Sequence, residues 1–176
     1  MSISALIAAL VYPLRRNPTL AGKVASNGPY NSVSEEAPAD SEYDVSIAGG
    51  QLTLGGHRAA DLAAQFGTPL YVYDMKTIRH QIAAYGRALA AYPGPSRLTY
   101  ASKAFLCTAL ARLLAAEGVG LDVASAGEIF IARQGGADPA GMQLHGNNKS
   151  RRDLAYALES GVGRIVVDNE AEVERL

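Results

Sequence analysis

Lys103 is the residue of this chain best placed for covalent chemistry, because it directly follows a short apolar segment that is predicted to be a strand. It stands in TYASKAF, residues 99–105. Polar residues at the carboxyl ends of parallel strands gather at one edge of a sheet, where the β/α loops build active sites. A partly desolvated lysine there can form a Schiff base with a carbonyl compound. A solvated lysine that merely ends the strand explains the residue equally well.

Two acids flank the next predicted strand–helix turn, in GLDVASAGE, residues 120–128. Asp122 lies inside a mostly apolar strand, where a carboxylate requires a partner such as a lysine or a hydroxyl. A buried structural hydrogen bond would account for it as well as a functional role. Glu128 opens the following helix, and acids favour helix N-termini on electrostatic grounds alone.

The loop after the third strand reads HGNNKS, residues 145–150. It places His145, two amides and a lysine where an anionic or zwitterionic ligand could bind. Glycine and asparagine also suit an ordinary turn, so an unliganded loop is the alternative interpretation.

The second half of the chain alternates between predicted strands and helices. Strands are expected at 97–101, 119–123, 142–145 and 163–167, and helices at 105–117, 127–134, 150–159 and from 169 onward. Short apolar strands alternating with amphipathic helices indicate a parallel sheet with helical crossovers. The predicted class is therefore α/β, either a doubly wound sheet or a (β/α)8 barrel. Periodicity alone does not choose between them.

The first half is less regular. Residues 1–42 are predicted to be a tail and linker, and residues 43–54 a β hairpin around a Gly-Gly pair. A helix over 57–66, a strand over 69–73 and an amphipathic helix over 78–89 are expected to follow. The proposed division of the chain is 1–42, then 43–66 as hairpin and leading helix, then 67–176 as the main α/β region.

Composition excludes several classes of function. The formal net charge is −1 and no basic stripe with interleaved aromatics occurs, so a nucleic-acid partner is not expected. No apolar run is long enough for a membrane span. A single cysteine, Cys107, fits a reducing compartment, and the scattered histidines do not form a metal site. A complete barrel needs about 250 residues, so the chain is expected to be a fragment; a complete four-stranded sheet is the alternative.

Five segments in this order resemble the diaminopimelate decarboxylase family of pyridoxal phosphate enzymes: FGTPLYVYD at 66–74, YASKAF, GLDVASAGE, HGNNKS, and GVGRIVVDNEAEVERL at 161–176. The resemblance implies the alanine-racemase-like (β/α)8 barrel, of which about four β/α units are present here. The early hairpin would join a C-terminal β domain. Most phosphate-binding and substrate-binding groups of the family come later in the chain, so the isolated fragment is expected to be inactive.

The resemblance also implies site residues and a reaction. Lys103 would carry pyridoxal phosphate, with Asp122, Glu128 and His145 near the cofactor. The enzyme would decarboxylate meso-2,6-diaminopimelate to L-lysine, as a cytoplasmic homodimer. Alternatives are a decarboxylase of ornithine, arginine or carboxynorspermidine, or a non-catalytic pyridoxal phosphate-binding or regulatory paralogue.

Overall fold

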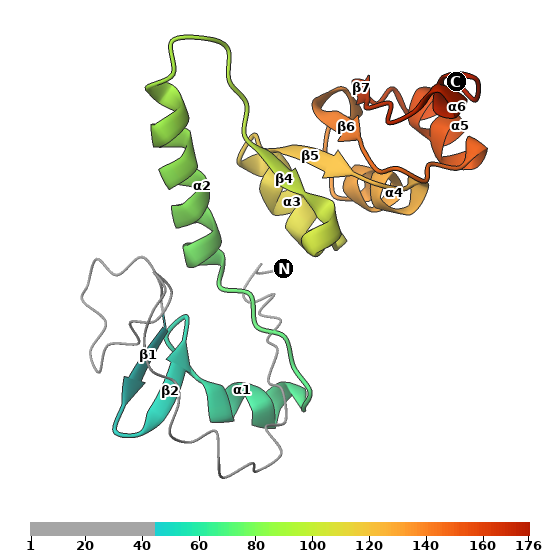
Figure 1. Cartoon of the computed structure of the whole chain (residues 1–176). Helices are drawn as coiled ribbons and strands as arrows, with labels where there is room; N and C mark the ends of the chain where they lie inside the picture. The colour runs from blue at the N-terminus through green and yellow to red at the C-terminus, as the bar shows by residue number, and fades with distance from the viewer. Residues whose placement is uncertain (1–44) are drawn as a thin grey trace, which may run out of the picture. The chain divides into compact units, whose positions relative to one another are not determined.

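The computed structural model describes residues 45–176, and these fall into two compact units (Figure 1). One unit runs up to Gln81 and the other comprises Ile82–Leu176. The predicted tail and linker of residues 1–42 lie outside the described residues, as do the first two residues of the predicted hairpin.

The first unit begins with a three-stranded antiparallel sheet followed by a helix. Its elements are β1 (Val45–Ala48), β2 (Gln51–Leu54), β3 (His57–Arg58) and α1 (Ala59–Phe66). The hairpin prediction is confirmed: Gly49 and Gly50 form the turn with φ of 57° and 73°, a region that glycine adopts without strain. The predicted helix start at His57 is wrong, because this residue pairs with Leu54 in the sheet.

The predicted strand at 69–73 is also wrong. The structure assigns no strand to these residues, because none of the described strands forms a ladder with them. The amphipathic helix that follows is confirmed as α2 (Met75–Ala90). Asp74 starts it by accepting hydrogen bonds from the backbone amides of Lys76 and Thr77, each at 3.0 Å.

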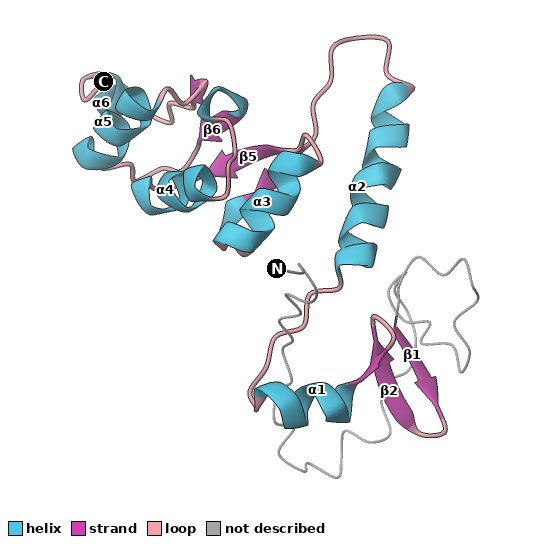
Figure 2. Ribbon diagram, turned by 180° about the vertical axis from the view of Figure 1, so that it is seen from behind, coloured by secondary structure: helices cyan, strands magenta, loops and turns pink. Residues whose placement is uncertain are grey.

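The second unit is built on a four-stranded parallel sheet in the order β4-β5-β6-β7 (Figure 1), and Figure 2 shows its helices from behind. Each strand is followed by a helix, as the sequence predicts. The elements are β4 (Thr99–Ala101), η1 (Ser102–Ala104), α3 (Thr108–Ala116), β5 (Gly120–Val123), α4 (Ala126–Gln134), η2 (Pro139–Gly141), β6 (Met142–Leu144), α5 (Arg151–Ser160), β7 (Arg164–Ile165) and α6 (Glu170–Val173).

The core of this unit lies between the middle strands and their helices. Leu121 and Leu144 on the strands, together with Ile129 and Leu154 on the helices, are at most 2% exposed. Burying such side chains contributes about 2 kcal/mol each. The core therefore holds β5 and β6 in place, and the carboxyl ends of these strands carry the residues of interest.

Side-chain caps start three of the helices directly after the strand ends. Ser125 accepts from the amide of Glu128, and Asn169 accepts from that of Glu172. Ser150 and Asp153 form a capping box at the start of α5. These caps fix the loops between strands and helices, which are the loops that border the site.

Candidate functional site

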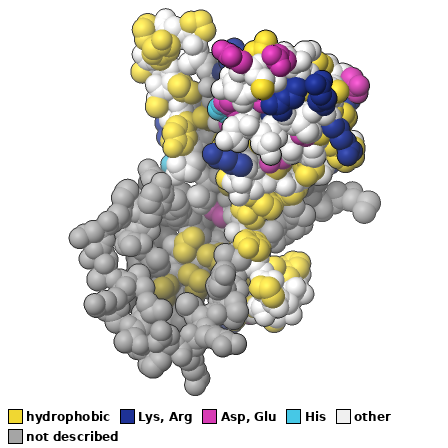
Figure 3. Space-filling view, turned by 45° about the vertical axis from the view of Figure 1, so that its right-hand side comes forward, with side chains coloured by type: hydrophobic (Ala, Val, Ile, Leu, Met, Phe, Trp, Pro, Cys, Tyr) yellow, Lys and Arg dark blue, Asp and Glu magenta, His cyan; other side chains and the backbone are white. Residues whose placement is uncertain are grey.

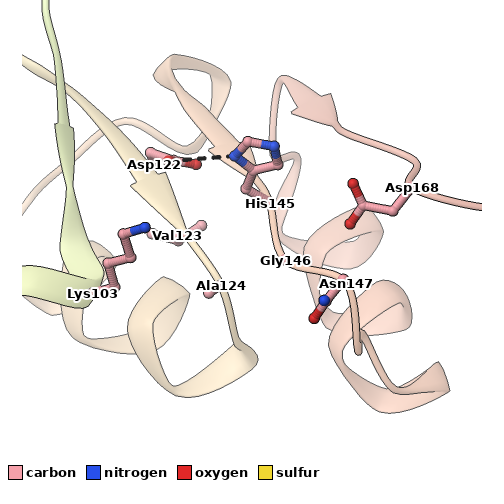
Figure 4. A pocket seen from close by; sticks show the side chains of 8 residues that line it. All are labelled: Lys103, Asp122, Val123, Ala124, His145, Gly146, Asn147 and Asp168. Carbon is pink, nitrogen blue, oxygen red and sulfur yellow. Dashed lines mark ion pairs between the residues drawn. The ribbon is translucent and has the colours of Figure 1, made fainter.

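A pocket of about 270 Å³ opens at the carboxyl ends of the parallel strands (Figure 4). Its lining combines an amine, two carboxylates, an imidazole and an amide. The lining residues are Lys103, Asp122, Val123, Ala124, His145, Gly146, Asn147 and Asp168. They come from the ends of all four strands, so the structure brings Lys103, Asp122 and His145 together at this edge.

Lys103 reaches the pocket from the turn after β4. The strand ends at Ala101, and a single 3-10 turn places Lys103 on the pocket wall with an exposed side chain. Its neighbour Ser102 is buried, and the Ser102 hydroxyl has no hydrogen-bond partner in the described part of the chain. The predicted helix start at residue 105 is off by three residues, because residues 105–107 form an irregular segment between η1 and α3.

Asp122 and His145 face each other from neighbouring strands. Asp122 Oδ2 lies 3.5 Å from His145 Nδ1, and Figure 4 shows the two side chains pointing toward one another. The other carboxylate oxygen, Oδ1, is buried and lacks a hydrogen-bond partner among residues 45–176. A buried carboxylate oxygen is stabilised by a donor, so this atom is available to a cationic or hydrogen-bonding group of a ligand.

Glu128 does not line the pocket. One of its carboxylate oxygens accepts a hydrogen bond of 2.6 Å from the amide of Ala124, which itself is a lining residue. In this structure Glu128 shapes the loop between β5 and α4. Its predicted contact with a cofactor stays a prediction.

Two lining residues go beyond the site residues named from the sequence: Asp168 is new, and Asn147 is expected only as one of the two amides of the HGNNKS loop. Asp168 directly follows the predicted strand at 163–167, so the rule that selects Lys103 by its position would also have selected it. Asn147 lies within the HGNNKS loop, whose polar character does point to it.

The loops carrying these two residues meet at a buried lysine. Lys149 Nζ is 2.9 Å from Glu172 Oε2 and 3.6 Å from Asp168 Oδ2, and it also donates to the carbonyl oxygen of Gly146. Lys149 and Glu172 are 1% and 0% exposed. The hydrogen bond from Lys149, with help from the amide of Asp168, lowers the pKa of Glu172 below its usual value. Glu172 therefore stays ionised beside the ammonium group.

The C-terminal unit carries both signs of charge on its surface. Basic and acidic side chains are interspersed on the visible face of the C-terminal unit (Figure 3). Within residues 45–176, no helix has the length and apolar character needed to cross a bilayer. The same residues contain no group of three or more histidine, cysteine, aspartate or glutamate side chains able to hold a metal ion.

Comparison with known proteins places the chain in a family. Residues 75–176 match the pyridoxal binding domain of the pyridoxal-dependent decarboxylases. The diaminopimelate decarboxylase of Staphylococcus aureus is 41% identical over 125 residues, which are 71% of this chain and 30% of that protein. The chain thus spans less than a third of the length of this relative.

Solved structures agree with this assignment. The diaminopimelate decarboxylase of M. jannaschii in complex with L-lysine aligns with a TM-score of 0.67 and 32% identity, over 74% of this chain and 31% of that one. The lysine/ornithine decarboxylase of Vibrio vulnificus in complex with cadaverine aligns with a TM-score of 0.59 and 32% identity, over 66% and 31%. The predicted partial (β/α)8 barrel is thereby confirmed, and the chain belongs to the pyridoxal-dependent decarboxylase family.

Proposed function

We propose that this chain supplies four β/α units of a pyridoxal phosphate enzyme that decarboxylates meso-2,6-diaminopimelate to L-lysine, with Lys103 as the residue that holds the cofactor. The observation that carries the proposal is the position of Lys103. In a chain of this family, its amine lines a polar pocket at the carboxyl edge of the parallel sheet. This edge is where barrel enzymes place their catalytic groups.

The residues present fit the cofactor. The pocket volume of about 270 Å³ is near the lower end of the range for small-molecule sites, roughly 300 Å³ and above. It offers an exposed primary amine for covalent attachment. It also offers the buried oxygen of Asp122 that lacks a partner among the described residues, which suits a donor or a cationic group of a bound molecule.

Each side chain would have a limited task. Pyridoxal phosphate, when bound, supplies an electron sink for the negative charge left as carbon dioxide departs. Lys103 would hold the cofactor covalently through its amine. His145 would orient the carboxylate of Asp122 from a neighbouring strand. Asn147 and Asp168 add a neutral amide and a carboxylate to the pocket wall, and such groups can hydrogen-bond the polar ends of an amino acid.

The choice of substrate rests on the relatives. The proteins of S. aureus and M. jannaschii are both named diaminopimelate decarboxylases, and the latter was crystallised with L-lysine. The V. vulnificus neighbour favours a second candidate, decarboxylation of ornithine or lysine. A cytoplasmic location and a homodimeric assembly belong to the proposal on the strength of the family resemblance.

Reductive trapping tests the cofactor assignment. The 176-residue chain is mixed with pyridoxal phosphate, reduced with borohydride and digested, and the modified lysine is located by mass spectrometry. We expect the phosphopyridoxyl group at Lys103, its loss in Lys103→Ala, and an unchanged adduct in Lys76→Ala, which removes an exposed lysine of α2. Labelling spread evenly over the lysines would refute the assignment.

Turnover tests the substrate separately, in an enzyme that contains this chain. We expect carbon dioxide from meso-diaminopimelate and little from ornithine, arginine or lysine. A preference for ornithine or lysine would establish the second candidate instead. A trapped adduct at Lys103 without turnover of any of them would indicate a non-catalytic binding protein.

A further inference from the structure

The buried side chain of Lys149 is unusual because it lies outside the pocket yet touches the backbone that forms it. Lysine is almost never fully buried unless its charge is paired. Here the ammonium group meets Glu172 at 2.9 Å and Asp168 at 3.6 Å, and it donates to the carbonyl oxygen of Gly146. One cation therefore contacts groups from two separate β/α loops.

Both of these loops line the pocket. The loop after β6 contributes His145, Gly146 and Asn147, and the loop after β7 contributes Asp168. Gly146 adopts a φ of 106°, so the peptide whose carbonyl Lys149 holds has a conformation that favours glycine. The orientation of this peptide determines the direction in which the backbone places Asn147, the next residue.

Further hydrogen bonds join the same two segments. Arg175 Nη1 donates to the backbone carbonyl of Lys149 at 2.9 Å. The amide of Asp168 donates to Glu172 Oε2 at 3.0 Å, the same oxygen that binds Lys149. Glu172 thus holds the β7 loop with one contact and Lys149 with another. Asp168, whose side chain is 33% exposed, pairs with the same ammonium group and also lines the pocket.

We propose that Lys149 and Glu172 are positioning residues, whose buried ion pair locks the β6 and β7 loops together and so sets the relative placement of His145, Asn147 and Asp168. This proposal deepens the proposed function, on which it rests. Neither residue lines the pocket itself. They act through the residues that do, and their role extends the site to α6.

The test uses the full chain and a readout that does not depend on cofactor. His145 is one of three histidines, so its imidazole signal in a histidine-labelled sample can be assigned by its absence in His145→Gln. We expect Lys149→Met to shift or broaden this signal, because the loop that carries His145 loses its anchor. Lys76→Met makes the same chemical change at an exposed lysine and should leave the signal unchanged.

A double variant separates positioning from simple stability. Replacing a buried ion pair with apolar residues often preserves or raises stability, so Lys149→Met with Glu172→Leu should fold even where the single variant does not. We expect the double variant to regain the denaturation midpoint while keeping the altered His145 signal. A folded single or double variant with the wild-type His145 signal would overturn the proposal.

Reductive trapping of pyridoxal phosphate at Lys103 tests whether the ion pair also affects cofactor binding. At a pyridoxal phosphate concentration well below that needed for full labelling, we expect the double variant to lose about tenfold in labelling, the lower end of the loss that removing an outer-shell hydrogen-bond partner causes at metal sites. Labelling within twofold of the wild-type chain would refute the role in the site. If the wild-type chain is not labelled at Lys103, the proposed function fails, while the His145 signal still decides whether the two loops are locked.

Discussion

Loss of Asp153 should disturb the loops beside the pocket, although this residue does not line the pocket. It lies in the first turn of α5 and accepts three hydrogen bonds. Its two oxygens bind the amide of Ala126 at 2.8 Å, the amide of Ser150 at 3.0 Å and the Ser150 hydroxyl at 2.5 Å. The Asp153 carboxylate thus caps the N-terminus of its own helix, α5, and also accepts a hydrogen bond from the first backbone amide of α4.

The expected cost follows from these contacts. A hydrogen bond of this kind contributes about 1 kcal/mol, and loss of a helix cap costs about 1 kcal/mol. The side chain is half-buried, so water replaces part of what is lost. We therefore expect Asp153→Ala to lower the free energy of unfolding by about 2 kcal/mol and Asp153→Asn, which keeps one acceptor oxygen, by about 1 kcal/mol.

Urea denaturation followed by circular dichroism measures the global effect, and hydrogen exchange at the amide of Ala126 measures the local one. Glu159→Ala is the matched control, because this acid is exposed at the other end of the same helix. An Asp153→Ala chain within about 0.5 kcal/mol of the wild type, the usual range for surface changes, with unchanged exchange at Ala126, would refute the reasoning.

The loss of stability caused by replacing Asp153 should depend on pH, because the group removed is a carboxylate. Burial alone would raise the pKa of Asp153, but hydrogen bonds from the Ser150 side chain and from the amides of Ala126 and Ser150, with the nearby Arg152 charge, lower it below the ordinary value of 3.8. A group whose pKa is lowered by folding stabilises the folded state fully above its unfolded pKa, and this contribution is lost as the pH falls through the folded pKa. The gap between wild type and Asp153→Asn should therefore be constant near neutral pH and shrink below pH 3.8.

Three further changes probe the core and the backbone, each by urea denaturation. Leu121→Ala removes a side chain that is 1% exposed and should cost about 3 kcal/mol, whereas Leu158→Ala, at 59% exposure, should cost little; equal costs would contradict the assigned core. Gly163→Ala would force a methyl group against the carbonyl oxygen of Ala140 and should cost about 2 kcal/mol or more, and a neutral result would contradict this close approach. Gly161→Ala, at the left-handed end of α5 with a φ of 76°, should cost about 1 kcal/mol, and an unchanged midpoint would show that the helix ends otherwise.

The sequence predicts the second unit well because its local and long-range signals agree. Each strand is a short apolar run, each helix has a cap or a stop, and the near-constant spacing leaves a parallel sheet as the simplest arrangement. Residues 69–73 show the limit of this reasoning. They have the composition of a strand, but a strand also needs a neighbour with which to pair, and composition does not supply that information.

Some residues of the candidate site could likewise be predicted from the sequence and others could not. Lys103, Asp122 and His145 could be found because their positions next to strands are visible in the sequence. Lys149 could not be recognised as buried, since a lysine in a polar loop is normally solvated. Its burial depends on Glu172, which belongs to a later helix and reaches Lys149 only after the chain has folded.

The pocket therefore depends on charged residues that do not line it. Asp153 joins the loop after β5 to the loop after β6, through Ala126 and Ser150. Lys149 joins the loop after β6 to the loop after β7, through Gly146 and Asp168. The loops after β5, β6 and β7 are thus linked in succession by two charged side chains from the segment that begins α5. The conformation of one β/α loop does not by itself fix that of the next. These two links therefore explain how side chains from separate strand ends can be held as one site.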